Sequence, residues 1–288
     1  MTMRVLVTGA GGLLGRYVVR AFARAASVWA MRREDLDVRD RQQVERLVRE
    51  LRPQVVINCA ALSNVDLCER EPELAFQVNA EGPRHLAEAC RAVEAELVHI
   101  STDYVFDGSK RAPYTIADPP HPINCYGASK WAGEEAVRRA WARHYIIRPA
   151  RIFGLGGKNF ASTLPELLRT QPVLRAIVDE VGAPTYAADL AARILEILAR
   201  GRPGTYHVTN RGVCSWYEFA CEVARRMGCD RVRIEPVRSA DLERPARRPL
   251  YTELRCLLSE QLGLPPLRPW SLALRDFLEE VKRDESLC

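Results

Sequence analysis

A tyrosine and a lysine four residues apart, Tyr126 and Lys130, are the side chains of this sequence best suited to acid–base chemistry. On a helix, residues i and i+4 lie on one face, so the phenol and the ammonium can point toward the same place. The reference pKa of a phenol is about 10. A cation about 4 Å away, at an effective dielectric of 20, is worth roughly 4 kcal/mol or about three pKa units. We therefore predict that Lys130 lowers the pKa of Tyr126 and makes it a proton donor at neutral pH.

Hydroxyl-bearing residues lie upstream of this pair, at the end of the apolar run Leu97 to Ser101. Thr102 is placed to bind a substrate carbonyl oxygen, and Tyr104 to line the pocket beside it. The alternative is that these hydroxyls only cap the end of a strand by local hydrogen bonds. Because Thr102, Tyr126 and Lys130 match several catalytic roles at once, we favour the catalytic interpretation.

A glycine-rich turn follows the first apolar run, Arg4 to Val7, and opens a helical pattern. Its first glycine allows a tight turn, its second lets the backbone approach a pyrophosphate, and its third permits close packing of the helix. We predict a dinucleotide here; the alternative is a glycine-rich turn without a ligand. The cofactor-binding residues expected in this turn are Gly9, Gly12, Leu13, Leu14 and Gly15.

The second predicted strand ends in Arg32-Arg33, where NAD-binding chains carry an acidic residue. Basic residues suit a 2′-phosphate, so we predict NADP(H) as the preferred cofactor and NAD(H) as the alternative. In an arginine-rich chain the pair can also be plain surface. Further cofactor contacts are expected from two residues of the adenine pocket and three small residues that end the third strand: Asp37, Val38, Cys59, Ala60 and Ala61.

Short β-rich runs alternate with helical patterns in the first half of the chain. This alternation predicts βαβ units and an α/β fold with a Rossmann-type doubly wound parallel sheet, whose ligands bind at the carboxyl ends of the strands. The predicted strands are 4–7, 28–31, 55–59, 97–101 and 145–148, and the predicted helices are 13–25, 41–51, 71–93 and 126–140.

Prolines punctuate shorter elements in the second half. We expect a dinucleotide-binding Rossmann domain over residues 1–154. Residues 155–288 should form mainly a smaller, mixed substrate-binding region, with segments such as Gly204 to Val208 returning to the main sheet.

Composition excludes several classes of protein. The net charge of +5 is modest and the basic residues form no long run, which favours a small anionic ligand over nucleic acid. The sequence has neither a signal-like leader nor 18 consecutive apolar residues, so we expect a cytoplasmic protein without a membrane partner. Nine scattered cysteines without a C-x-x-C pair predict neither disulfides nor a zinc site, and no metal cluster is visible.

Some glutamates and histidines of the sequence are predicted to have structural roles only. The adjacent Glu134 and Glu135 resemble a solvated helix face, and His99 and His207 are predicted to be strand histidines. Because the chain has no G-x-S-x-G motif, a serine hydrolase is not supported.

Taken together, these residues resemble the extended short-chain dehydrogenase/reductases, and specifically the dTDP-4-dehydrorhamnose reductase family. The similarity runs through nearly the whole chain, and the segment Ser101 to Gly108 (STDYVFDG) is its most specific part. It also includes Val7-Thr8-Gly9, Val78-Asn79-Ala80, Tyr126-Gly127 with Ser129-Lys130, Gly133-Glu134, Pro184-Thr185 and Ser215-Trp216-Tyr217.

The resemblance implies hydride transfer from NADPH or NADH to the C4 ketone of a dTDP-linked 6-deoxy-4-ketohexose. Tyr126 would donate the proton, Thr102 would orient the carbonyl, and Lys130 would hold the nicotinamide ribose. The substrate-binding residues that the resemblance implies are Ser63, Val65, Thr102, Asp103, Tyr104, Tyr126 and Arg151. It also allows a homodimer and a Mg²⁺ ion, to which no residue is assigned.

Two departures from the family pattern concern the substrate. Arg151 stands where the family usually has a tryptophan that packs on the sugar, and an arginine there can instead meet a diphosphate or a carboxylate. Arg244, Arg247 and Arg248 lie in a tail segment that resembles the family's R-P-x-N-S-x-L but lacks its Asn-Ser, and they are either diphosphate contacts or plain surface.

One alternative function belongs to another class. The chain is also similar to the methionine adenosyltransferase beta subunit, a non-catalytic, NADP-binding regulatory subunit that shares this fold and much of the STDYVFDG segment. Fold alone does not separate this alternative from the reductase.

Overall fold

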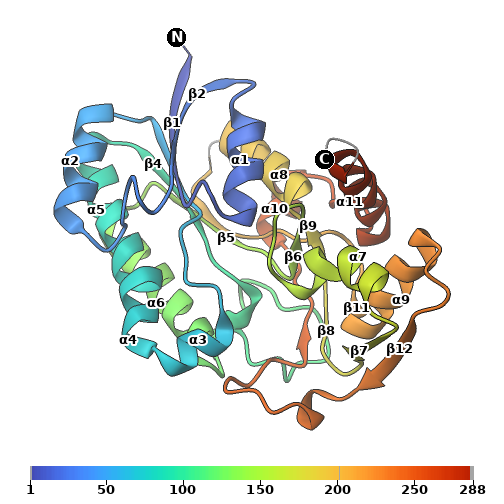
Figure 1. Ribbon diagram of the computed structural model, residues 1–288. Helices are drawn as coiled ribbons and strands as arrows, with labels where there is room; N and C mark the ends of the chain where they lie inside the picture. Colours follow the sequence, from blue (N-terminus) through green and yellow to red (C-terminus); the bar gives the residue numbers. More distant parts are fainter. Residues whose placement is uncertain (1, 201, 286–288) are drawn as a thin grey trace.

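A six-stranded parallel sheet forms the centre of the computed structural model, which describes residues 2–200 and 202–285 (Figure 1). The strand order is β10-β5-β4-β3-β1-β2, so the chain starts near one edge and winds outward in both directions. This confirms the predicted doubly wound α/β fold. The strands are β1 (Met3–Thr8), β2 (Ala26–Met31), β3 (Val55–Asn58), β4 (Glu96–Ile100), β5 (His144–Arg148) and β10 (Gly204–His207).

Helices cover both faces of this sheet (Figure 1). Alternate residues of a strand point to opposite faces. Accordingly, Val5 and Val7 of β1 join one core cluster and Leu6 joins the other. Helices α1 (Leu13–Phe22) and α8 (Ala187–Arg200) pack together on the first face, and α2 (Arg41–Leu51), α5 (Gly82–Val93) and α6 (Cys125–Ala140) on the second.

The single helix predicted over 71–93 is interrupted in the structure. It consists of α4 (Pro72–Phe76), a π-helical turn η1 (Gln77–Glu81) and α5, and is preceded by the separate helix α3 (Val65–Arg70). The turn lies against α6 at Gly133, where an added Cβ would be 2.1 Å from the Asn79 carbonyl oxygen. The π-helical turn therefore coincides with a close contact with α6, which the helical pattern of the sequence does not reveal.

The second half builds a smaller, mixed region beside the main sheet. Part of it returns to the sheet, because β10 pairs with β5. Its other strands form small sheets: β7 (Val173–Ile177) with β12 (Arg233–Val237), β6 (Ile152–Phe153) with β9 (Thr185–Tyr186), and β8 (Val181–Gly182) between β11 (Cys214–Ser215) and β13 (Tyr251–Thr252). Its helices are α7 (Phe160–Thr170), α9 (Trp216–Met227), α10 (Leu257–Gln261) and α11 (Trp270–Glu285), with a short 3₁₀ turn at Ser239–Asp241. A second 3₁₀ turn, Asp103–Val105, follows β4 in the first half.

One hydrophobic cluster joins the two halves. It contains Val5 and Ile57 from the main sheet together with Phe153, Phe219 and Phe277 from later elements. The division at residue 154 therefore stays a prediction, because the core is continuous across it.

Within the described residues, no helix is both long and apolar enough to cross a bilayer. The eight cysteines in this part of the chain are free thiols, and Cys288 lies outside it. Over the same ranges, His, Cys, Asp and Glu side chains form no group of three or more that could hold a metal ion.

Candidate active site

The glycine-rich turn packs its backbone tightly between β1 and α1. Gly9 has φ +65°, and an added Cβ there would lie 2.5 Å from the amide nitrogen of Ala60. At Gly15 an added Cβ would lie 2.2 Å from the Gly9 carbonyl oxygen. These two glycines let the turn approach the end of β3 and let α1 approach the turn.

The outer side of this turn is open. Gly12 is exposed and caps α1 without a side-chain hydrogen bond, and the first turn of α1 carries no acidic residue. A Cβ at Gly12 would meet only the Gly9 carbonyl oxygen, at 3.2 Å. Unpaired N–H groups at a helix N-terminus favour an anion. The cradle therefore fits the pyrophosphate of a dinucleotide, with Leu13 and Leu14 in the first turn of α1.

The basic pair at the end of β2 lies next to this cradle. Arg32 and Arg33 are both exposed, and the Arg32 Cγ would be 3.5 Å from a Cβ added at Gly11. The Arg32 guanidinium pairs with Glu34 at 3.9 Å, a long ion pair between two exposed side chains. Both guanidinium groups are thus accessible to a phosphate near the glycine turn.

Asp37 forms an ion pair with Arg39 at the edge of a hollow. Its carboxylate accepts hydrogen bonds from the Arg39 guanidinium, including one of 2.5 Å, and Arg39 lowers its pKa. A hollow of about 480 Å³ beside it is also lined by Gln77, Glu81 and His85. The next residue, Val38, is buried against Gly82. Asp37 lines the hollow together with its ion-pair partner Arg39.

Small residues end β3 beside the cradle. Cys59 and Ala60 are partly buried, and Ala61 is exposed. Burial raises the pKa of the Cys59 thiol to about 12, although the nearby Lys130 ammonium opposes the rise. Cys59 is therefore a neutral thiol next to Lys130, not a nucleophile.

The predicted catalytic residues come from two adjacent elements. Thr102 follows β4 and is buried; its hydroxyl donates to Asp103 (3.0 Å) and accepts from the Tyr104 amide (3.2 Å). The rings of Tyr104 and Tyr126 meet edge to face with centroids 5.7 Å apart. Lys130 is buried one turn further along α6, and its ammonium donates to the Ile100 carbonyl at 2.6 Å.

The structure contradicts the predicted effect of Lys130 on Tyr126. Burial raises the pKa of Tyr126, the Thr102 hydroxyl counteracts the rise, and Lys130 is not among the groups that shift it. Burial also lowers the pKa of Lys130 to about 8, against the charge of Glu134. Desolvation disfavours the charged form of both groups and outweighs the attraction we had counted on. The phenol of Tyr126 is therefore neutral at pH 7.

Arg151 lies close to these residues and adopts an unusual backbone conformation, with φ 46°. Its guanidinium donates to the Cys214 carbonyl (3.0 Å) and stacks on the Trp216 ring, 4.3 Å from the centroid. Burial lowers the pKa of Arg151, whereas nearby groups, among them Tyr104 and Asp103, raise it. Asp103 is itself buried, which raises its pKa, and hydrogen bonds with Thr252 and Thr102 oppose the rise.

Asn79 is a residue whose role sequence reasoning missed. Its side-chain amide pairs with both backbone groups of Leu62, at 2.9 and 3.0 Å, and donates to Ser129 on α6 at 3.0 Å. The exposed Ser63 and the partly buried Val65 follow directly on this anchored loop. The only sequence signal for Asn79 was its place in the Val78-Asn79-Ala80 match.

The arginines near residue 245 differ in their partners. Arg248 forms two 2.6 Å bonds with the Asp66 carboxylate on α3, and Arg244 pairs with Glu180. Arg247 is exposed, and its carbonyl accepts from Asn124 (2.7 Å), the N-cap of α6. This segment thus ties the second half of the chain to α3 and α6, and carboxylates already occupy two of its three guanidinium groups.

Glu134 was wrongly assigned to a solvated helix face. Its side chain is fully buried and bound by Arg148, Arg138 and Ser101. His99 and His207 lie in β4 and β10 as predicted, and burial lowers the pKa of both imidazoles.

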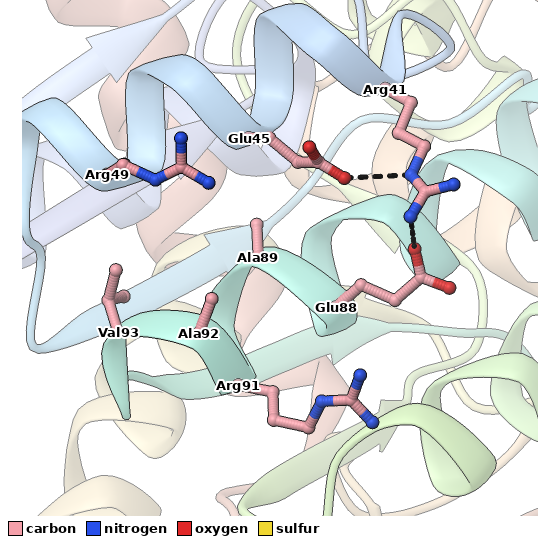
Figure 2. A pocket seen from close by; sticks show the side chains of 8 residues that line it. All are labelled: Arg41, Glu45, Arg49, Glu88, Ala89, Arg91, Ala92 and Val93. Atoms are coloured by element: carbon pink, nitrogen blue, oxygen red, sulfur yellow. Dashed lines mark hydrogen bonds and ion pairs between the residues drawn. The ribbon is translucent and has the colours of Figure 1, made fainter.

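A second hollow, of about 260 Å³, lies between α2 and α5 (Figure 2). Arg41 crosses it and pairs with Glu45 on its own helix and with Glu88 on α5 (Figure 2). The hollow borders the last turns of α5, which lead into the start of β4. Its lining includes none of the predicted site residues.

Comparison with known proteins identifies the family. The family model described as RmlD substrate binding domain matches residues 3–283. The chain belongs to this family. It is 44% identical over 280 residues to the dTDP-4-dehydrorhamnose reductase of Streptomyces griseus, covering 95% of this chain and 92% of that protein.

Two further relatives bear on cofactor and substrate. The dTDP-4-dehydrorhamnose reductase of Bacillus anthracis, solved in complex with NADP, has 36% identity and a TM-score of 0.95, covering 97% of this chain and all of that one. The dTDP-4-keto-6-deoxy-D-glucose reductase of Streptomyces niveus is 39% identical, covering 99% of this chain and 100% of that protein. The predicted family is thus confirmed, and its members are named for more than one ketosugar.

Proposed function

We propose that this protein reduces the C4 ketone of a dTDP-linked 6-deoxy-4-ketohexose with NADPH. The observation that carries the proposal is the convergence of Thr102, Tyr126 and Lys130 at the carboxyl end of β4, where Lys130 donates to the Ile100 carbonyl and Thr102 acts on the Tyr126 phenol, in a chain of this family. Ligands of doubly wound sheets bind at that edge. The glycine cradle at the end of β1, on the far side of β3 from β4 in the same sheet, supports dinucleotide binding.

NADP(H) is the cofactor that the basic pair favours. Arg32 and Arg33 are exposed beside the cradle and can meet a 2′-phosphate. The NADP complex of the B. anthracis relative supports the same preference. When bound, the cofactor supplies the hydride, and the protein supplies binding and orientation.

Each member of the catalytic set has one role in this proposal. Lys130 holds the nicotinamide ribose, Thr102 donates a hydrogen bond to the carbonyl oxygen, and Tyr126 gives its proton to the oxygen as the C4 ketone is reduced. An alkoxide is a stronger base than a phenolate, so the transfer remains favourable although burial raises the pKa of Tyr126. A neutral phenol is the form that carries the proton.

Arg151 is proposed to line the sugar pocket. Its stack on Trp216 and its nearness to Tyr104 and Asp103 support this position. Guanidinium is a planar donor that suits a diphosphate or a carboxylate, whereas the tryptophan usual at this position of the family packs on the sugar. Because this contact differs, several dTDP-ketosugars should be tested as substrates. Ser63 and Val65, on the loop anchored by Asn79, complete the proposed substrate contacts.

The test is turnover of a ketosugar panel by the purified protein. With NADPH and dTDP-4-dehydrorhamnose or dTDP-4-keto-6-deoxyglucose, the wild type should consume the nicotinamide absorbance. Tyr126→Phe should lose at least about 100-fold in kcat, the contribution of a general acid. Tyr217→Phe, on α9, is the matched control and should keep wild-type turnover.

The outcome also separates the alternative function. If the wild type binds NADPH but reduces no member of the panel, the reductase proposal fails. Unchanged binding by Tyr126→Phe together with activation of a partner enzyme would then favour the non-catalytic regulatory subunit.

A further inference from the structure

Glu134 is a fully buried carboxylate with four charged or polar donors around it, and its relative side-chain exposure is 0%. Arg148 donates from Nε to Oε1 (2.8 Å) and from its terminal nitrogen to Oε2 (2.7 Å). Arg138 donates to Oε2 (2.7 Å), and the Ser101 hydroxyl donates to Oε1 (2.5 Å). A buried charge is tolerated only when it is paired and hydrogen-bonded in this way.

The partners of Glu134 are fixed by packing. Arg148, at the end of β5, is 3% exposed and stacks over Phe106 at 5.2 Å. Its other terminal nitrogen lies 3.3 Å from His207, whose pKa is lowered to about 3 by burial and by the Arg148 charge, so the imidazole is neutral. Arg138 and Arg148 both lie over the Trp131 ring. The carboxylate therefore has little freedom to move.

The position of Glu134 relates this cluster to the reaction. It lies on α6 one turn after Lys130, and its partner Ser101 directly precedes Thr102. One carboxylate thus joins the helix that carries Tyr126 and Lys130 to the end of the strand that carries Thr102.

We propose that Glu134 is a positioning residue for the reduction: through Ser101 and Arg148 it holds α6 against the ends of β4 and β5, so that the three catalytic side chains face one substrate carbonyl. This inference rests on the proposed function, because it assigns those side chains their roles. Misplacement of a reacting group by about 1 Å can cost roughly 100-fold in rate, so a rigid tie between the two elements has a catalytic consequence.

The charge of Glu134 also acts on the ammonium of Lys130. The groups that face Lys130 from other elements are Cys59, Cys68 and His99. Burial raises the pKa of both thiols to about 12 and lowers the pKa of His99, so all three are neutral at pH 7. Among the groups that shift its pKa, Glu134 is the one that carries a negative charge at this pH, and it keeps Lys130 protonated against burial.

The sign of the resulting pH dependence follows directly. The protonated form of Lys130 is the active one, so the rate falls as the pH rises through its pKa of about 8. Glu134→Gln removes the opposing charge, lowers this pKa and moves the alkaline fall in kcat to lower pH. The expected shift is about one pH unit, which corresponds to an interaction of roughly 1.4 kcal/mol between the two charges. A purely structural defect would scale the profile without moving it.

A second variant tests the mechanical tie alone and retains the buried ion pair. Ser101→Ala keeps the Glu134–Arg148 pair but removes the hydrogen bond to β4. We expect about a tenfold loss of kcat, an unchanged alkaline limb and NADPH affinity within about twofold of wild type, while Ser101→Thr, which keeps the hydroxyl, should restore the rate. If Glu134→Gln does not fold, this pair of variants decides the matter.

Glu135→Gln is the matched control, because Glu135 adjoins Glu134 but is 33% exposed and pairs with Arg138 and Arg139 on its own helix. It should leave kcat and the pH profile at wild-type values. An active wild type whose profile is unmoved by Glu134→Gln and whose kcat is unchanged by Ser101→Ala would overturn the inference alone. An inactive wild type would overturn the proposed function.

Discussion

The tightest backbone contact of the proposed cofactor site yields the sharpest prediction. In Gly15→Ala, the new Cβ would lie 2.2 Å from the Gly9 carbonyl oxygen, 2.8 Å from the Ala10 Cα and 2.9 Å from the Gly9 carbonyl carbon. An ordinary contact of a Cβ with another heavy atom is 3.4–4 Å, so the contact with the Gly9 carbonyl oxygen is more than about 1 Å too close. All three atoms are backbone, and none can move aside by a rotamer change.

The turn must therefore open, at a cost we can bound. Overpacking typically costs about 1–3 kcal/mol. At roughly 2–4 °C per kcal/mol, the Tm of Gly15→Ala should fall by about 2–12 °C. The displaced turn also moves the N-terminus of α1, so NADPH should bind at least about tenfold more weakly, a change of roughly 1.4 kcal/mol.

Thermal unfolding with and without NADPH, combined with a binding titration, measures both effects. Gly11→Ala is the control in the same turn, because its Cβ would meet only the Arg32 side chain, at 3.5 Å or more. Its stability should stay within about 0.5 kcal/mol of wild type. A Gly15→Ala protein with wild-type Tm and NADPH affinity would refute the packing argument.

Two further predictions concern charges. Replacing Arg32 and Arg33 together by Ser should weaken NADPH at least about tenfold and leave NADH nearly unchanged, as seen in the two KM values, because only NADPH carries the 2′-phosphate; equal losses for both cofactors would contradict this. Arg248→Met should cost about 1–3 kcal/mol at pH 7, since it leaves the Asp66 carboxylate, 28% exposed, without its partner. Arg248 lowers the pKa of Asp66, so this stabilisation is complete above the unfolded-state pKa of about 3.9 and disappears as the pH falls through the folded-state value. The Tm difference from wild type should therefore shrink in acid; a gap independent of pH would rule out the ion pair as its source.

Local patterns were sufficient to predict the main sheet and the glycine cradle. The first half of the chain alternates apolar runs with helical patterns, and five of the six sheet strands lie where those runs predicted them. The positive φ of Gly9 and the lack of space at Gly15 follow from the turn itself. Such features depend on residues close together in sequence, and the carboxyl-end rule then places the ligand.

The helix α6 shows where local patterns fail. Its buried residues include Gly127, Ser129, Lys130, Gly133 and Glu134, which are not the apolar residues that mark an ordinary core face. For this reason no local pattern indicated that Glu134 is buried while Glu135 beside it is not. The difference comes from Arg148 and Ser101, which reach Glu134 from two other elements.

The sequence by itself determined the residue types available for reduction, their order and the edge of the sheet at which they meet. Only the tertiary structure decided their environment. Burial raises the pKa of Tyr126, and the Lys130 ammonium donates to the Ile100 carbonyl. Arg151 stacks on Trp216, a residue 65 positions later in the chain. Desolvation and long-range contacts depend on how the whole chain packs, and spacing along one helix contains no information about either.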